Sequence, residues 1–369
     1  MRIAIVGPTH PYKGGIAQYT TELAHRLNKS GHHVRIESWS HQYPRLLYPG
    51  QLTVATPERP VYPDTVRLLS WRRPDSWFRR GRAIRASGAD LVVLVVASPV
   101  QMPAYRCLLT TLRGGRNRPQ VVAQCHNVLP HERRAIDVRL MRSVLGRVDR
   151  VLVHSQEQGD VARELVNVPV TVERMAPMVV ASAVGHEPDP TVHRRLLFFG
   201  LVRPYKGLDV LLRALAAGPS DVSLVVAGEF WGGVGPTEKL VAELGISGRV
   251  DLRPGYVDAE DVPALFRDVD ALVLPYRSAT ASFNAYLGFE HGVPVIASRV
   301  GTLPDDVRDG VDGLLCEPDD VESLASALSV FYSDDTPSRL RAKVLGPDAG
   351  PAWTRYVEAL TATGENGVR

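Results

Sequence analysis

Two cations three residues apart occupy the turn between an apolar run and a helical pattern. Arg203 and Lys206 follow "RLLFFG", a run typical of a buried parallel strand. Leucines recur at helical spacing from Leu208 onward, so we expect a helix to begin directly after Lys206. Such turns lie at the carboxyl edge of a parallel sheet, where backbone N–H groups and the helix dipole already favour an anion. The pair therefore predicts an anion-binding site.

The composition is that of a folded, nearly neutral chain. It has 369 residues, 44% of them hydrophobic, and a formal net charge of +3. This length suits two domains, and the weak charge gives no argument for nucleic-acid binding. The cysteines Cys107, Cys125 and Cys316 lack metal-ligand spacing, which argues against a zinc site and fits a reducing compartment. No apolar run approaches the roughly 20 residues of a membrane helix, so we expect a cytoplasmic protein.

Short apolar runs alternate with helical patterns, and this series occurs twice. Nearly continuous Val, Ile and Leu indicate strands buried on both faces, hence an α/β fold with parallel sheets covered by helices. Residues 179–195, rich in proline and small residues, predict a linker between the two series. The expected parts are a first domain, a second domain and a final helix, over residues 1–185, 186–346 and 347–369. Trp353, Tyr356 and Leu360 recur at helical spacing in the last part.

Five stretches, in this order and spacing, resemble glycosyltransferase family 4. They are "GPTHPYKGGIAQYTTELAHRLNKSGHHV", "FFGLVRPYKGLDVLLRALA", "LVVAGE", "RPGYVDAEDVPALFRDVDALVLPY" and "HGVPVIASRVGTLPDDVRDGVDGLLCEPDDVESLASAL". The resemblance covers almost the whole chain. It implies the GT-B architecture, two facing Rossmann-like domains whose last helix crosses back to the first. It also implies retaining transfer from a nucleotide-diphosphate sugar, and we expect no metal or other cofactor.

The resemblance gives the two cations a catalytic role. Arg203 and Lys206, with Gly200 before them, would hold the donor diphosphate and stabilise the charge that grows on it as the sugar bond breaks. Many family members carry the arginine directly after the glycine, where this chain has Leu201. Arg203 must therefore reach the phosphate from two positions later. The alternative, and the ordinary interpretation of a basic pair in isolation, is a solvated helix start without a functional role.

Further donor contacts are implied in the second half of the chain. The backbone of Tyr256 and Val257 is expected beside the nucleotide base, because the family reads the base largely through main-chain groups. The predicted helix start after "YRSATA" could also receive the diphosphate through backbone amides. The residues that would offer these amides are Ser282, Phe283 and Asn284.

Two glutamates that are usual in the family are missing. One normally lies near the donor sugar and the other holds the ribose, and their positions here are Ala279 and Leu287. Glu290, one turn beyond Leu287, either substitutes in part or is a solvated surface residue. The loss leaves a second function open, a GT-B chain that binds a nucleotide or a partner without transferring sugar. An epimerase of the same fold would need an acidic pair for proton transfer, and the sequence offers none that we can identify.

The first half supplies candidates for contacts with the donor and with the acceptor. The paired glycines Gly14 and Gly15 precede a helical pattern, where the backbone can closely approach a phosphate of the donor or an acceptor, and we expect them to bind the donor. His126 follows a buried strand, and the resemblance places a histidine there near the donor sugar, although such a residue can also be purely structural. His131 and Glu132 are weaker candidates for acceptor contacts.

Residues 67–86 form an arginine-rich stretch in the same half. They contain seven arginines against one acid, Asp75, with Trp71, Trp77 and Phe78 interleaved. Cations attract anionic headgroups and aromatic rings settle at the bilayer interface, so this stretch predicts peripheral contact with the inner membrane face and a lipid-linked acceptor. The alternative is a solvated arginine face whose aromatic residues belong to the core.

Overall fold

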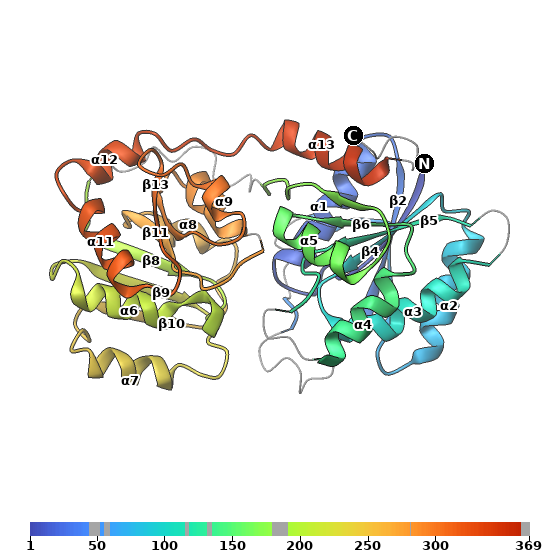
Figure 1. Ribbon diagram of the computed structural model, residues 1–369, viewed down its shortest axis with the longest axis horizontal. Helices are drawn as coiled ribbons and strands as arrows, with labels where there is room; N and C mark the ends of the chain where they lie inside the picture. The colour runs from blue at the N-terminus through green and yellow to red at the C-terminus, as the bar shows by residue number, and fades with distance from the viewer. Residues whose placement is uncertain are drawn as a thin grey trace. The chain divides into compact units, whose positions relative to one another are not determined.

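The computed structural model describes residues 1–43, 52–54, 60–114, 118–130, 135–178, 191–280 and 282–362. The chain divides into two compact units, Met1–Ala176 with Gly350–Arg369, and Pro177–Ala349. Each unit contains one parallel sheet flanked by helices (Figure 1). The predicted α/β fold with two parallel sheets is therefore confirmed. The predicted boundary between residues 185 and 186 lies outside the described residues.

The first unit is built on a seven-stranded sheet in the order β3-β2-β1-β4-β5-β6-β7. Its elements are β1 (Arg2–Val6), α1 (Gly15–Lys29), β2 (His33–His41), β3 (Thr65–Ser70), α2 (Pro74–Ala86), β4 (Leu91–Val96), the 3₁₀ helix η2 (Pro99–Gln101), α3 (Met102–Leu112), β5 (Gln120–Cys125), α4 (Ala135–Leu145), β6 (Arg150–Val153), α5 (Gln156–Leu165), β7 (Val170–Val172) and the final helix α13 (Ala349–Thr361).

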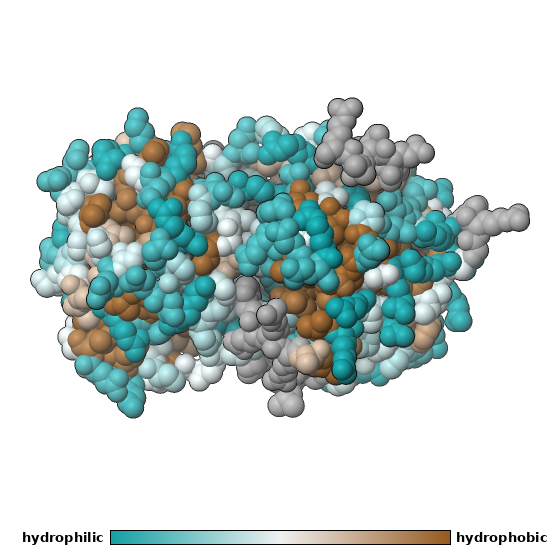
Figure 2. Space-filling model, viewed as in Figure 1, coloured by the Kyte–Doolittle hydropathy of each residue, from teal (hydrophilic) through white to brown (hydrophobic). Residues whose placement is uncertain are grey.

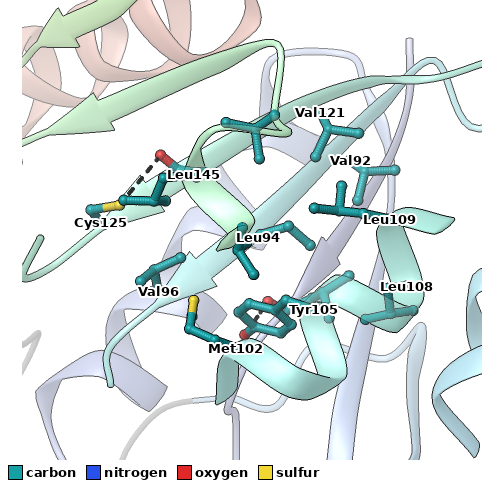
Figure 3. Packing of buried hydrophobic residues seen from close by; sticks show 14 of the residues in the cluster. Val92, Leu94, Val96, Met102, Tyr105, Leu108, Leu109, Val121, Cys125 and Leu145 are labelled. Atoms are coloured by element: carbon teal, nitrogen blue, oxygen red, sulfur yellow. Dashed lines mark hydrogen bonds between the residues drawn. The ribbon is translucent and has the colours of Figure 1, made fainter. Parts of the chain in front are cut away.

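The core of this unit lies between the central strands and the helices α2, α3 and α4. Alternate residues of β4, among them Leu94 and Val96, point toward Tyr105 of α3 in Figure 3. The Tyr105 hydroxyl is buried and donates a hydrogen bond to the carbonyl oxygen of Val95 (2.8 Å). Each buried aliphatic or aromatic side chain contributes roughly 1.5–3 kcal/mol. This packing gives the carboxyl edge of the sheet a rigid base.

The final helix packs on the first unit rather than on the second. Trp353 of α13 stacks on Tyr19 of α1, with ring centroids 5.0 Å apart, and the Tyr356 hydroxyl accepts a hydrogen bond from Gln124 Nε2 (2.6 Å). Figure 1 shows α13 beside α1. The predicted helix and its return to the first part of the chain are confirmed.

The second unit is built on a six-stranded sheet in the order β10-β9-β8-β11-β12-β13. Its elements are β8 (Arg195–Phe199), the 3₁₀ helix η4 (Pro204–Lys206), α6 (Leu208–Ala217), β9 (Ser223–Gly228), α7 (Gly235–Glu243), β10 (Val250–Pro254), α8 (Val262–Phe266), β11 (Ala271–Leu274), α9 (Phe283–Glu290), β12 (Val295–Ser298), α10 (Leu303–Asp306), β13 (Gly313–Cys316), α11 (Val321–Phe331) and α12 (Thr336–Arg341).

Two apolar clusters sandwich this second sheet. Leu196 and Phe198 of β8 pack with α6, α7 and α11, whereas Leu197 between them packs with α8, α9 and α10. Successive strand residues point to opposite faces, so a strand covered on both sides must be apolar throughout. The arrangement leaves the carboxyl ends of β8, β9 and β11 as the edge where polar side chains gather.

Candidate functional site

The connection between β8 and α6 is as compact as the sequence predicts. The helix α6 begins at Leu208, directly after the 3₁₀ turn Pro204–Lys206. Gly207 joins the two with φ +64°, and a Cβ at this position would lie 2.0 Å from the carbonyl oxygen of Pro275. Only glycine fits there. The turn that carries Lys206 is therefore pressed against the segment that follows β11.

Lys206, Gly200 and Asn284 converge at this edge. A Cβ at Gly200 would lie 3.6 Å from Lys206 Nζ and 3.5 Å from Asn284 Nδ2. The ammonium group also lies 5.1 Å from the ring centroid of Tyr276, which is 3% exposed. The lysine ammonium group, the side-chain amide of Asn284 and the glycine backbone thus meet at one point of the carboxyl edge. These are groups expected at an anion-binding site.

The environment keeps Lys206 charged at neutral pH. Burial alone would lower the pKa of its ammonium group, but the neighbouring hydroxyl-bearing rings of Tyr276 and Tyr205 raise it, and the net pKa lies above the ordinary value. A charge-bearing lysine that is half-buried is poised to hold a phosphate.

Arg203 is positioned by aromatic rings. Its guanidinium lies 4.5 Å from the ring centroid of Trp231 and 5.9 Å from that of Tyr205. Trp231 follows β9, and its amide donates a hydrogen bond to the carbonyl oxygen of Val202 (3.0 Å). The cation–π contact holds the side chain on this edge of the sheet. Sequence reasoning missed Trp231 and Tyr276, although both are aromatic residues shortly after a strand at the ligand-binding edge.

The helix start at α9 differs in detail from the expectation. Ser282 is the N-cap, and its hydroxyl accepts a hydrogen bond from the amide of Asn284 (3.3 Å). The Asn284 side chain instead donates to the carbonyl oxygen of Phe199 (2.9 Å) and to the Tyr276 hydroxyl (3.2 Å). The amide of Asn284 is therefore already engaged, and its side chain is what approaches Lys206. Phe283 is the first residue of α9.

The positions of the two missing glutamates are apolar and partly buried. Ala279 and Leu287 both pack against the cluster formed with α8, α9 and α10. Glu290 is the last residue of α9, six positions after Asn284 and thus about 9 Å along the helix axis. Both of its carboxylate oxygens are buried, so it is not a solvated surface residue.

Tyr256 and Val257 follow β10 at the same edge of the sheet. β10 is separated from β8 by β9, so these residues lie to the side of the Lys206 turn. Val257 packs partly buried on the apolar cluster, and Tyr256 is half-buried.

In the first unit, His126 meets the second turn of α1. Gly14 has φ +95° and caps α1, which begins at Gly15, and four residues on, Tyr19 contacts the His126 ring edge-on at 5.8 Å. The His126 amide donates to the carbonyl oxygen of Val96 (2.9 Å). Paired glycines and histidine therefore belong to one edge of the first sheet.

His126 is a neutral, buried imidazole. The residue is 7% exposed, and its ring lies 5.2 Å from the ring of His154, centroid to centroid. Burial, and secondarily His154, holds the pKa of His126 well below its ordinary value. Its Nε2 is buried and has no hydrogen-bond partner within the described part of the chain. His131 and Glu132 lie outside the described residues.

The structure divides the arginine-rich stretch into an inward and an outward set. Arg80 forms two hydrogen bonds with Glu37, which is 1% exposed, and Trp77 packs against the core while donating to the carbonyl oxygen of Ser70. Trp71 and Phe78, in contrast, are 36% and 38% exposed. The arginines on the outward side are Arg72, Arg73, Arg79, Arg82 and Arg85. On the face drawn in Figure 2, hydrophilic residues intermingle with apolar ones.

The described residues contain neither a cluster of metal ligands nor a membrane-spanning helix. No three His, Cys, Asp or Glu side chains in those residues gather as a metal site requires. None of the helices in the described ranges has both the length and the apolar content needed to cross a bilayer.

Two family models match the chain, one in each unit. Residues 13–175 match the model described as "Glycosyltransferase Family 4" and residues 193–334 the model described as "Glycosyl transferases group 1". A D-inositol 3-phosphate glycosyltransferase of Mycobacterium sp. (strain KMS) is 32% identical over 219 residues, which are 55% of this chain and 49% of that protein. Its counterpart from Mycobacterium marinum (strain ATCC BAA-535 / M) is 29% identical over 244 residues, 60% of this chain and 51% of that protein. The chain thus spans about half the length of these curated relatives.

Solved structures share the fold over nearly the full length. Anabaena HepE, in complex with UDP and glucose, aligns with a TM-score of 0.75 at 15% identity, covering 98% of this chain and 100% of that one. Sucrose-phosphate synthase from Thermosynechococcus elongatus aligns with a TM-score of 0.69 at 20% identity, covering 98% and 95%. At such identities the likeness shows the fold alone, and it confirms the expected GT-B architecture.

Proposed function

Since this chain belongs to glycosyltransferase family 4, we propose that it moves a sugar from a nucleotide-diphosphate sugar to an acceptor hydroxyl with retention of configuration. The observation that carries the proposal is the convergence of Lys206, Gly200 and Asn284 at the carboxyl edge of β8. The complex of Anabaena HepE with UDP and glucose supports a nucleotide donor for a chain of this fold.

The chemistry assigned to the second unit is charge stabilisation. The bond between the anomeric carbon and the diphosphate oxygen breaks, a bond from that carbon to the acceptor oxygen forms, and the hydroxyl proton passes to the departing diphosphate. Lys206 and Arg203 stabilise the negative charge on that leaving group more in the transition state than in the ground state. Tyr256 and Val257 are proposed to contact the base, and Ser282, Phe283 and Glu290 to complete the donor site.

Groups of the first unit are proposed to act on the sugar and the acceptor. His126, held neutral by burial, can offer or accept a hydrogen bond at the donor sugar without adding charge. Gly14 and Gly15 leave space at the start of α1, since a Cβ at Gly14 would meet no atom within 4 Å. His131 and Glu132 stay predicted acceptor contacts.

A screen of nucleotide sugars tests this function. The purified protein should release free nucleoside diphosphate from at least one of them, slowly with water and faster with a suitable acceptor. Lys206→Ala should slow that release by about tenfold to a hundredfold, the scale of one lost charge-assisted contact. Lys239→Ala is the matched control, because Lys239 is a 78% exposed lysine of α7 in the same unit. Equal rates in wild type and Lys206→Ala would overturn the assignment.

A second candidate function rests on the apolar residues Ala279 and Leu287, which replace the family's two glutamates. A chain without these carboxylates could bind a nucleotide sugar or a partner and not transfer the sugar. The same screen separates the two. Binding of a nucleotide sugar with no release of diphosphate, across a panel of sugar and lipid-linked acceptors, would favour the binding function.

For the acceptor, we propose a lipid-linked sugar reached by peripheral contact with an anionic membrane. The outward side of α2 and the turn before it combine five exposed arginines with Trp71 and Phe78, and Leu68 on the edge strand β3 is 57% exposed. Each cation near an anionic bilayer contributes about 1 kcal/mol, and exposed aromatic rings enter the interface. Arg80 and Trp77 do not belong to this surface, because Arg80 binds the buried Glu37 and Trp77 packs against the core.

Cosedimentation with vesicles tests the membrane contact. The protein should pellet with vesicles containing phosphatidylglycerol at low salt, and less so as salt rises. Replacing Arg72, Arg79 and Arg82 by Ala should abolish pelleting. The control replaces three exposed arginines elsewhere in the unit, Arg139, Arg147 and Arg163, and should leave pelleting intact. A protein that stays in the supernatant at low salt would point to a soluble acceptor instead.

A further inference from the structure

Three consecutive residues after β11 contact the turn that carries Lys206. The carbonyl oxygen of Pro275 lies against Gly207, and the ring of Tyr276 lies beside the Lys206 ammonium group. The backbone amide of Arg277 donates a hydrogen bond to the carbonyl oxygen of Tyr205 (2.7 Å). The Arg277 side chain also reaches the turn, because its Nη1 donates to the carbonyl oxygen of Pro204 (2.8 Å). One residue thus binds two successive carbonyl groups of the turn.

Two carboxylates fix this guanidinium from other elements. Asp209, in the first turn of α6, accepts hydrogen bonds from Nη1 (2.8 Å) and Nη2 (2.9 Å) of Arg277. Asp319, just before α11, accepts one from Nε (2.7 Å). All three nitrogens of the planar group are therefore committed, and the guanidinium connects the turn, α6 and the approach to α11. A lysine could not reproduce this fork.

We propose that Arg277, held by Asp209 and Asp319, is a positioning residue that fixes the turn Pro204–Lys206 so that Lys206 and Arg203 face the donor diphosphate. The inference takes its ligand, the donor diphosphate, from the proposed function. The effect of Arg277 on the conformation of the turn can be measured without any ligand. Arg277 and Asp209 are 30% and 41% exposed, and ion pairs so open to water add little to global stability. Positioning, rather than stability, is what this network supplies.

Hydrogen–deuterium exchange and nucleotide binding test the proposal together. In Arg277→Met, which removes the forked donor but keeps an unbranched side chain, the amides of Lys206 and Gly207 should exchange at least about tenfold faster, with little change in the thermal midpoint. The control is Arg213→Met, because Arg213 also pairs with Asp209 (3.2 Å), from α6 and without a contact to the turn carbonyls. Its exchange should match wild type. Arg277→Lys should resemble Arg277→Met, since one ammonium group cannot serve the turn and both carboxylates.

Binding of UDP, GDP and ADP is measured on the same proteins. If wild type binds one of them, Arg277→Met should weaken that affinity about tenfold and Arg213→Met should not. Unchanged exchange at Lys206 and Gly207 in Arg277→Met, or full retention of wild-type exchange in Arg277→Lys, would overturn the positioning role. If exchange is faster in Arg277→Met but wild type binds none of the nucleotides, the positioning role is upheld and the proposed function is contradicted.

Discussion

At the scale of single residues, His154 shows how burial sets a charge state in the first unit. The ring is fully buried, and its Nδ1 donates to the carbonyl oxygen of Glu173 (3.2 Å). Burial lowers the pKa of His154 to about 4 from an ordinary 6.5, although the hydrogen bond to Glu173 offsets part of the effect. The folded protein therefore keeps this residue neutral over a range of pH in which the unfolded chain protonates it.

The sign of the resulting pH dependence follows directly. The contribution of the neutral His154 to the free energy of unfolding is present above pH 6.5 and is lost as the pH falls toward 4. In that window only the unfolded state takes up the proton. At pH 5 the loss from this group amounts to about 2 kcal/mol. His154→Asn, which keeps a donor for Glu173 but does not titrate, should flatten this part of the dependence. Denaturant unfolding at pH 7.5 and 5.0 measures it, and equal losses in both proteins would refute the role of His154.

The proposed anion site at the carboxyl edge of the second sheet was predictable to the extent that it lies in one local pattern. Arg203, Lys206 and the helix behind them form a continuous strand-turn-helix stretch, so their placement followed from spacing. Trp231, Tyr276 and Arg277 were missed because they reach the turn from the ends of β9 and β11, tens of residues away along the chain. Contacts between neighbouring loops depend on sheet order, which apolar runs alone do not reveal.

At the scale of elements, α13 is held on the first unit by an unusual cap. Arg150 of β6 is 8% exposed and donates to the carbonyl oxygens of Ala359 and Leu360, the latter at 2.7 Å. These carbonyls lie in the last turn of α13, where the helix dipole favours a cation. A buried arginine on a strand thus satisfies carbonyl groups at the end of the helix, as a glycine cap does in other helices.

Removing this cap should loosen the final helix. Arg150→Met leaves the carbonyls without a cationic donor, and we expect the free energy of unfolding to fall by about 2 kcal/mol. Amides of residues 350–362 should also exchange faster. Arg147→Met, at a neighbouring exposed arginine, is the control and should change neither quantity. Denaturant unfolding with peptide-level exchange decides the matter, and an Arg150 variant as stable as the control would contradict the capping role.

The strands that the sequence did not reveal share a physical reason. β3 lies at the edge of the first sheet and mixes exposed with buried residues, so its "TVRLLS" merges into the arginine-rich stretch. β7 and β13, of three and four residues, are also edge strands, one in each sheet. The interior strands were predictable because burial on both faces demands unbroken Val, Ile and Leu.

At the scale of the whole molecule, we propose that the protein's own cations neutralise the charge on the donor diphosphate. Turnover should therefore persist in excess EDTA, because Lys206 and Arg203 occupy the role that a divalent ion fills at many diphosphate sites. The measurement is the release of nucleoside diphosphate with EDTA and with added magnesium. Loss of activity in the chelator, restored by magnesium, would show that a metal shares this role.

Calorimetry of nucleoside diphosphate binding to the full chain tests the proposed role of Lys206 at the edge of the second unit's sheet. UDP, GDP and ADP are titrated into wild type, and the tightest ligand into Lys206→Ala and Lys239→Ala. We expect Lys206→Ala to lose about 1.5–3 kcal/mol of binding free energy, the scale of a charge-assisted contact, and the exposed control to bind as wild type does. Identical affinity in Lys206→Ala and wild type, or no binding of any of the three by wild type, would contradict the proposed role.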